Sequence, residues 1–241
     1  MIGIRRAISL LLLSLFFWNF VLTALLGPDE LFACFTGLSI VYGLAFIGVA
    51  AEWFWARWFA IGLGNFGSLT LLSLLQAGME PTILVFGLSH LVVSLFLGGE
   101  GMAARYEHSE TTAERWNFQE ESLVLMRRAI KSAGMSLPLL ILYTLAPAPE
   151  AMHLIALAAG ATGVYGLLRG RTWGLLAMAG AGLIALADGL GMFGPATVSY
   201  LLLTPSGSVI LWGPVFALLA GSMLAAPLVY TAPMLRFLRQ R

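Results

Sequence analysis

The sequence predicts an all-α fold, a polytopic transmembrane helical bundle of about eight spans, and three observations support this. Of the 241 residues, 59% are hydrophobic and only 10% are charged, whereas an ordinary soluble domain carries roughly a quarter charged residues. Long apolar runs recur along the whole chain. The segments between these runs alternate between basic and acidic. Since backbone polar groups in lipid must bond within their own segment, we expect each run to be a helix.

The runs have the length that a bilayer requires. A helix needs roughly 20 apolar residues to cross about 30 Å of hydrocarbon. The predicted spans cover about 7–27, 31–51, 56–77, 82–98, 132–148, 150–168, 172–193 and 208–231. The first run follows Arg5 and Arg6 and is longer than the apolar core of a signal peptide, so we interpret it as a retained span. Pro147 and Pro149 separate the fifth span from the sixth.

The charges predict the orientation. If eight helices alternate from a cytoplasmic N-terminus, all 13 basic residues fall in cytoplasmic segments. The outer segments contain Asp29, Glu30, Glu80 and Glu150 instead. Because basic residues resist translocation, this bias predicts that both termini are cytoplasmic. With no organelle address visible, we expect residues 1–241 to form one domain in a cytoplasmic (inner) membrane.

Residues 99–131 form the longest cytoplasmic segment, and we predict an amphipathic helix within it. Thr111 and Glu114 have the spacing of a capping box. Trp116, Leu123 and Ile130 then recur every seven residues along one face. This face would either pack on the chain itself at the membrane surface or dock a membrane or cytoplasmic protein partner.

Two segments resemble each other across the chain. Residues 37–44 (GLSIVYGL) match residues 160–167 (GATGVYGL) at five of eight positions, with an offset of 123 residues. The similarity predicts a four-plus-four parallel duplication. The alternative is chance similarity between two spans that are rich in glycine and leucine.

Glycine spacing favours close helix packing. Residues 62–67 spell GxGxxG, but inside an apolar span the motif has no strand-to-helix turn to meet a pyrophosphate, so we discard a dinucleotide site. The series Gly166, Gly170 and Gly174, and the pair Gly180 and Gly182, let helix backbones approach closely instead.

Few polar side chains lie within the predicted spans, and the candidate binding residues among them are Asn19, Asn65, His90 and Asp188. Asn65 and His90 both lie about 12 Å from the cytoplasmic end of neighbouring spans, by the rise of a helix. This predicts a polar cluster in which His90 could couple to protons, or else a neutral imidazole bonded to Asn65 or to a carbonyl. Asp188 lies nearer the outer surface, where it is hydrated, lines a cavity or pairs with another span.

The sequence predicts no metal, disulfide or cofactor. Its three histidines, His90, His108 and His153, are expected at different depths, and Cys34 is the single cysteine. A net charge of +1 gives no reason to expect a nucleic-acid partner.

Residues 182–188 resemble one aspartate motif of the lysoplasmalogenase-like family, which implies a lipid-active enzyme. The second aspartate of such a site has no counterpart in the other spans, and we assign no family.

Three functions fit the sequence. A non-catalytic subunit or scaffold of a membrane assembly comes first, because intramembrane charge is scarce. The alternatives are a small-solute transporter or channel, coupled to protons through His90, and a lipid-active enzyme that uses Asp188, His90 or the pair Glu120 and Glu121.

Overall fold

The structure, a computed structural model, describes residues 2–77, 79–107, 120–145, 151–193, 199–204 and 207–239. Each predicted run contains a helix, namely α1 (Ile2–Leu26), α2 (Phe32–Ala50), α3 (Ala56–Ser68), α5 (Pro81–Leu97), α8 (Glu120–Leu145), α9 (Ala151–Leu168), α10 (Trp173–Gly189) and α11 (Gly213–Arg239). The fold therefore agrees with the prediction of an all-α protein. Shorter helices are η1 (Asp29–Leu31), η2 (Leu69–Ser73), α4 (Leu74–Ala77) and α6 (Glu100–Glu107).

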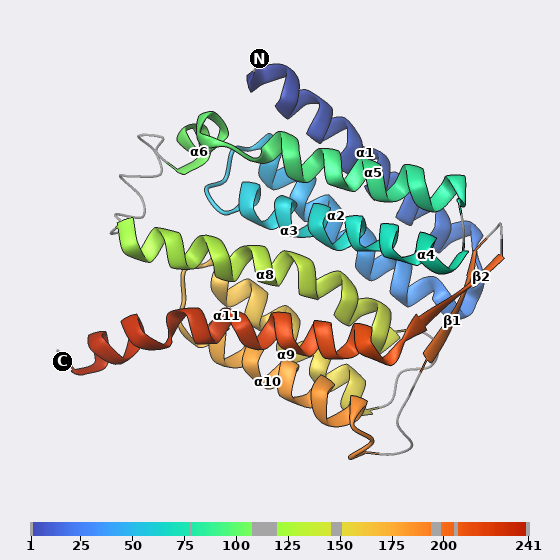
Figure 1. Ribbon diagram of the computed structural model, residues 1–241. Helices are drawn as coiled ribbons and strands as arrows, with labels where there is room; N and C mark the ends of the chain where they lie inside the picture. Colours follow the sequence, from blue (N-terminus) through green and yellow to red (C-terminus); the bar gives the residue numbers. More distant parts are fainter. Residues whose placement is uncertain are drawn as a thin grey trace.

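A β-hairpin differs from the prediction. Strands β1 (Ser199–Thr204) and β2 (Gly207–Trp212) pair antiparallel, with Ser199 opposite Trp212. The hairpin lies at the end of the bundle opposite the two termini (Figure 1). The last helix therefore begins at Gly213 rather than at residue 208, because β2 takes the first residues of the apolar run.

By length and composition, three described helical stretches could each cross a membrane: Ile2–Leu26, Asp29–Ala50 and Ala151–Leu168. Helices α5 and α6 would add a fourth if this pair, bent by 71°, is counted as one span. Helix α10 and residues 217–233 are apolar but shorter. These helices fit a membrane protein, but helix length alone does not fix the number of crossings.

The helices form two rings of four. In the N-terminal ring, α1 packs on α2, α2 on α3, α3 on α5, and α5 on α1. In the C-terminal ring, α8, α9, α10 and α11 follow each other in the same way and α11 returns to α8. The rings meet where α8 packs on α3 and α2, in the middle of Figure 1. Helix α1 makes no comparable contact with α9 or α10, so the interface is not two-fold symmetric.

Helix α3 is buried on nearly all sides, and its glycines allow this. At Gly62 an added Cβ would lie 2.9 Å from the Cα of Gly134 on α8, which brings the two ring backbones together. Gly64 packs against Ser94 of α5, and Gly67 lies against the ring of His90. The GxGxxG sequence thus serves helix packing.

In the second half of the chain, the structure confirms some of the predicted close contacts at glycine and not others. Gly166 and Gly174 lie backbone to backbone at the turn between α9 and α10, and Gly170 in that turn has a φ of 65°. Gly182 approaches α11, but an added Cβ at Gly180 would meet nothing within 4 Å.

Neighbouring helices alternate in direction, and both chain ends lie at the same end of the bundle (Figure 1). The described Lys and Arg residues lie toward this side, in the terminal turns of helices, in the turns between them or in the first half of α8: Arg5, Arg6, Arg57, Arg105, Arg127, Arg128, Lys131, Arg169, Arg171, Arg236 and Arg239. We call it the basic end. The described turns at the other end contain Asp29, Glu30 and Glu80, and we call that the acidic end.

The outer surface of the bundle is apolar between these ends. Helix α1 exposes one such stripe at helical spacing: Leu11, Leu15, Trp18, Leu22 and Leu25. A soluble protein seldom exposes so large an apolar surface to water. Lipid chains are as apolar as these side chains, so contact with lipid carries no such unfavourable free energy.

Candidate functional site

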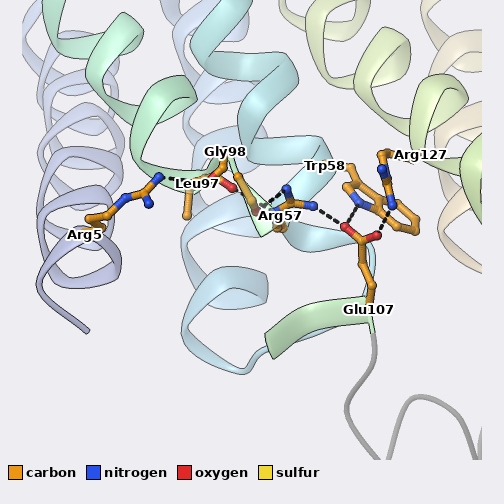
Figure 2. A network of polar contacts seen from close by, with 8 residues as sticks. Arg5, Arg57, Trp58, Leu97, Gly98, Glu107 and Arg127 are labelled. Atoms are coloured by element: carbon orange, nitrogen blue, oxygen red, sulfur yellow. Dashed lines mark hydrogen bonds and ion pairs between the residues drawn. The ribbon is translucent and has the colours of Figure 1, made fainter. Parts of the chain in front are cut away.

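At the basic end, a buried carboxylate accepts hydrogen bonds from donors on two helices, α3 and α8. Glu107, the last residue of α6, is 4% exposed. Its Oε1 accepts hydrogen bonds from Nη1 of Arg57 and, at 2.7 Å, from Nε1 of Trp58. Its Oε2 accepts from Nη2 of Arg127 on α8 (Figure 2). We call Arg57, Trp58, Glu107 and Arg127 the Glu107 cluster.

The bend between α5 and α6 places Glu107 under α3. Gly99 in this bend has a φ of 88°, a conformation that suits glycine. Nε of Arg57 donates to the carbonyl of Leu97 at 2.8 Å, and its Nη2 donates to that of Gly99 at 3.2 Å. Arg5 donates to the carbonyls of Leu95 at 2.9 Å and of Gly98 at 2.8 Å. Two arginines therefore bond carbonyls at the C-terminal end of α5 and in the bend, where part of the helical hydrogen bonding ends.

A second, more exposed ionic group lies nearby. Glu52, in the turn between α2 and α3, has a φ of 56°. Its Oε1 lies 3.0 Å from Arg6 of α1 and accepts a hydrogen bond of 2.5 Å from Arg105 of α6. The hydrogen bond from Arg105 is the main cause that lowers the pKa of Glu52. Tyr106 fixes α6 further by donating to the carbonyl of Val49 at 2.9 Å.

Positive charge exceeds negative charge around the Glu107 cluster. Arg128 and Lys131 follow Arg127 on the same turn of α8. Burial, and then the positive charges of Arg57 and Arg127, lower the pKa of Lys131. The single carboxylate of Glu107 thus faces two paired arginines with further cations beside them.

Within the bundle, both ring nitrogens of His90 are hydrogen-bonded. Its Nδ1 lies 2.8 Å from the carbonyl of Phe86, which can only accept, so we assign the proton to Nδ1. Its Nε2 then accepts from the hydroxyl of Tyr42 at 2.7 Å. The ring stacks on Phe16 at 3.8 Å between centroids, and the side chain is 1% exposed.

The expected cluster of His90 with Asn65 does not form. Instead, the side-chain oxygen of Asn65 on α3 accepts a hydrogen bond of 3.0 Å from the hydroxyl of Ser94 on α5. Of the two neutral alternatives, the carbonyl is the observed partner. Tyr42 was missed as a partner because depth places residues along a helix but does not say which way a helix is rotated.

At the acidic end, Asp188 joins three helices of the C-terminal ring. Its Oδ2 accepts a hydrogen bond from the hydroxyl of Tyr143 on α8. The same oxygen lies 3.0 Å from Nε2 of His153 on α9. Its Oδ1 has no hydrogen-bond partner among the described residues. We call Tyr143, His153 and Asp188 the Asp188 cluster.

Of the predicted roles for Asp188, pairing with other spans is therefore what the structure shows. Tyr143 and His153 were not proposed as partners. The sequence could have indicated them, because both lie within three residues of a helix end on the same side of the bundle as Asp188.

The remaining candidates do not join these clusters. The side chain of Asn19 is exposed on α1. Leu123 and Ile130 are buried in the core, at 7% and 0% exposure, so this part of the expected docking face packs on the chain itself. Trp116, the capping box of residues 111–114, His108 and the side chains of Glu120 and Glu121 lie outside the described residues.

The Glu107 cluster joins the two rings, since each carboxylate oxygen is bonded and the donors come from α3 and α8. We call this contact between α3 and α8 the joint. The Asp188 cluster has a carboxylate, an imidazole and a phenol in contact, the groups that general acid–base chemistry uses. Among the described residues, no three His, Cys, Asp or Glu side chains come together as metal ligands. Comparison of the chain with protein-family models, curated proteins and solved structures finds no match.

Proposed function

We propose that this chain crosses a cytoplasmic membrane eight times, with both termini inside, and acts as a non-catalytic subunit or scaffold of a membrane assembly. Two observations support this topology. Neighbouring helices alternate in direction, and the described basic residues gather at one end of the bundle. Basic residues are enriched on the cytoplasmic side of membrane proteins, so we assign the basic end to the cytoplasm. The apolar stripe on α1 supports contact with lipid.

A four-plus-four duplication belongs to this proposal. The two similar segments, residues 37–44 and 160–167, lie in α2 and α9, the second helix of each ring. Both rings connect their four helices in the same order. The unsymmetrical contact between the rings favours a tandem arrangement of the two units over a two-fold axis.

The observation that carries the scaffold proposal is the Glu107 cluster. Its buried ion pairs fasten the N-terminal ring to α8 of the C-terminal ring, next to the close approach of Gly62 and Gly134. A transporter that rocks one ring against the other would have to break these pairs. His90 also has both ring nitrogens bonded inside the chain, which leaves it a packing role rather than a solute-binding one.

Copurification tests the scaffold proposal. The tagged protein is extracted in mild detergent, cross-linked, and passed over a sizing column with mass measurement. We expect a protein partner at a fixed stoichiometry. Trp116→Ser tests the remaining residue of the expected docking face, and Trp173→Ser, which changes an exposed tryptophan of the basic end, is the matched control.

Loss of the partner in Trp116→Ser but not in Trp173→Ser supports docking through residues 99–131. A chain that elutes alone in every detergent and in native nanodiscs, while proteoliposomes that contain it move a solute, would contradict the scaffold.

A second candidate function rests on the Asp188 cluster. A carboxylate and a histidine 3.0 Å apart favour a lipid-active enzyme, with Asp188 as the residue that binds or deprotonates the reacting group. The protein in nanodiscs is incubated with phospholipid, and products are followed by mass spectrometry. This candidate predicts products from the wild type and from Asp29→Asn, which changes an exposed carboxylate at the same end, but not from Asp188→Asn.

A further inference from the structure

Among the residues that the structure describes, the basic end contains cationic groups without a bonded carboxylate. Within the described residues, Glu107 is the carboxylate bonded to Arg57 and Arg127, and Glu52 is engaged by Arg6 and Arg105. Arg128 is exposed and Lys131 half-buried, and no described acceptor bonds either side chain. The positive charge at the joint between α3 and α8 is therefore in excess.

One donor of this group is buried without a partner. Nε of Arg127 is shielded from solvent and has no hydrogen-bond acceptor. A buried donor without an acceptor costs about 1–3 kcal/mol, so an added acceptor at this position would be stabilising. Arg57, in contrast, bonds Glu107 and two carbonyls and has no comparable open donor.

The helix geometry brings the open donors together. Arg127 and Lys131 are four residues apart on α8 and share a face, and Arg128, three residues before Lys131, is an exposed neighbour of Lys131. The backbone of Lys131 lies at the crossing of α8 with Gly62 of α3. Arg127 and Lys131 thus border the seam between the two rings at the basic end, and Arg128 flanks Lys131 on the exposed side.

We propose that Arg127, Arg128 and Lys131 bind a phosphate-bearing anion at the seam between the two rings. Guanidinium and ammonium groups match the oxygens of a phosphate in charge and hydrogen bonding. At the cytoplasmic surface, basic pockets between helices meet the phosphates of anionic lipids, and free phosphate compounds offer the same chemistry. The oxygens of Glu107 do not bond every cationic donor at this position. A bound anion would supply further acceptor oxygens and so would stabilise the contact between α3 and α8.

The test compares the wild type, Arg128→Gln/Lys131→Gln and the matched control Arg169→Gln/Arg171→Gln. The control removes two exposed cations from the turn between α9 and α10 at the same end. Each protein is placed in nanodiscs of phosphatidylcholine, with or without phosphatidylglycerol, and in phosphatidylcholine with added inorganic phosphate. The unfolding midpoint is measured, and bound lipids are counted by native mass spectrometry.

We expect the wild type and the control to be stabilised by the anion and to retain it, while Arg128→Gln/Lys131→Gln binds it roughly tenfold more weakly or worse, as the loss of charge-assisted bonds implies. A response to phosphatidylglycerol alone identifies a lipid headgroup, and a response to inorganic phosphate as well identifies a soluble phosphate site.

Equal responses in all three proteins would show that the whole basic surface attracts anions, and this result would overturn the site. The absence of any response in the wild type would overturn it as well. Because each protein is compared with itself in neutral lipid, a change in intrinsic stability does not obscure either result.

Discussion

Glu107 and Asp188 are two carboxylates at opposite ends of the bundle, and their partners differ. Glu107 is 4% exposed, and its two oxygens accept from Arg57, Trp58 and Arg127. Asp188 uses one oxygen for Tyr143 and His153, and the other has no described partner. Both oxygens of the first carboxylate are bonded, by arginines from both rings and by Trp58, whereas the second bonds within one ring and has one oxygen without a described partner.

The difference indicates a division of roles. A buried carboxylate with both oxygens bonded inside the chain is well placed to hold helices together, so Glu107 stabilises the arrangement of helices. A carboxylate with an open oxygen beside an imidazole can still bind or accept a proton, so any chemistry belongs at the acidic end.

Removing the charge of Glu107 should have the largest effect. Glu107→Gln leaves Arg57 buried without its counter-charge, and breaking such a buried pair costs about 3–5 kcal/mol. The unfolding midpoint in nanodiscs should fall strongly, whereas Glu52→Gln, which changes a half-exposed pair, should cost about 1 kcal/mol or less. If both variants lowered the unfolding midpoint equally, Glu107 would contribute no more to stability than an exposed ion pair, which would contradict its role in joining the rings.

The close approach of the rings at Gly62 offers the next test. In Gly62→Ala the new Cβ would meet the backbone of α8 at Lys131 and Gly134. Overpacking of this kind costs about 1–3 kcal/mol. Gly180→Ala is the matched control, since its Cβ meets nothing within 4 Å, and it should be neutral or slightly stabilising. If Gly62→Ala unfolds at the same midpoint as Gly180→Ala, the rings are not as closely joined there as we describe.

Asp188 and His153 should be coupled to each other but not to the joint. In a double-mutant cycle with Asp188→Asn and His153→Ala, we expect a coupling of about 1 kcal/mol in unfolding free energy, as for residues in one hydrogen-bond network. A cycle of Asp188→Asn with Glu107→Gln should be additive, because these residues lie at opposite ends. Coupling in the second cycle would indicate that the two clusters act as a unit.

The smallest effect concerns pH. The hydrogen bond from Arg105 lowers the pKa of Glu52 from its usual value of 4.5, so folding favours the ionised carboxylate. Its stabilising contribution is complete above the unfolded value and is lost as the pH falls through the folded one. The difference in unfolding midpoint between wild type and Glu52→Gln should therefore shrink as the pH falls below the usual value of 4.5 and through the lowered pKa of the folded protein. A difference that grows with acidification would reverse the assigned direction.

The sequence predicted where helices lie because apolar length and chain breaks are local properties. It misplaced the start of α11, since residues 207–212 are as apolar as a membrane span but pair with β1. Hydropathy does not separate an apolar strand from the beginning of an apolar helix.

The clusters were harder to predict than the helices. The sequence predicts His90 and Asn65 at the same depth, but in the structure Asn65 bonds Ser94, one turn along α5, and His90 bonds Tyr42 of α2. In apolar helices that are hydrophobic on every face, spacing does not reveal this rotation. The apolar period of Leu123 and Ile130 likewise indicates a covered face, but it cannot say that the cover is the chain's own core.

Cysteine accessibility tests the central claim, that the basic end is cytoplasmic and the acidic end is outside. The single cysteine, Cys34, is buried and is replaced by alanine to give a cysteine-free chain. Cysteines are then placed one at a time at the exposed positions Met79 and Leu190 of the acidic end and Arg171 of the basic end. An impermeant maleimide should label Met79→Cys and Leu190→Cys on spheroplasts, and Arg171→Cys only after permeabilisation. Labelling of Arg171→Cys on intact spheroplasts, or protection of one acidic-end cysteine but not the other, would contradict the eight-span topology.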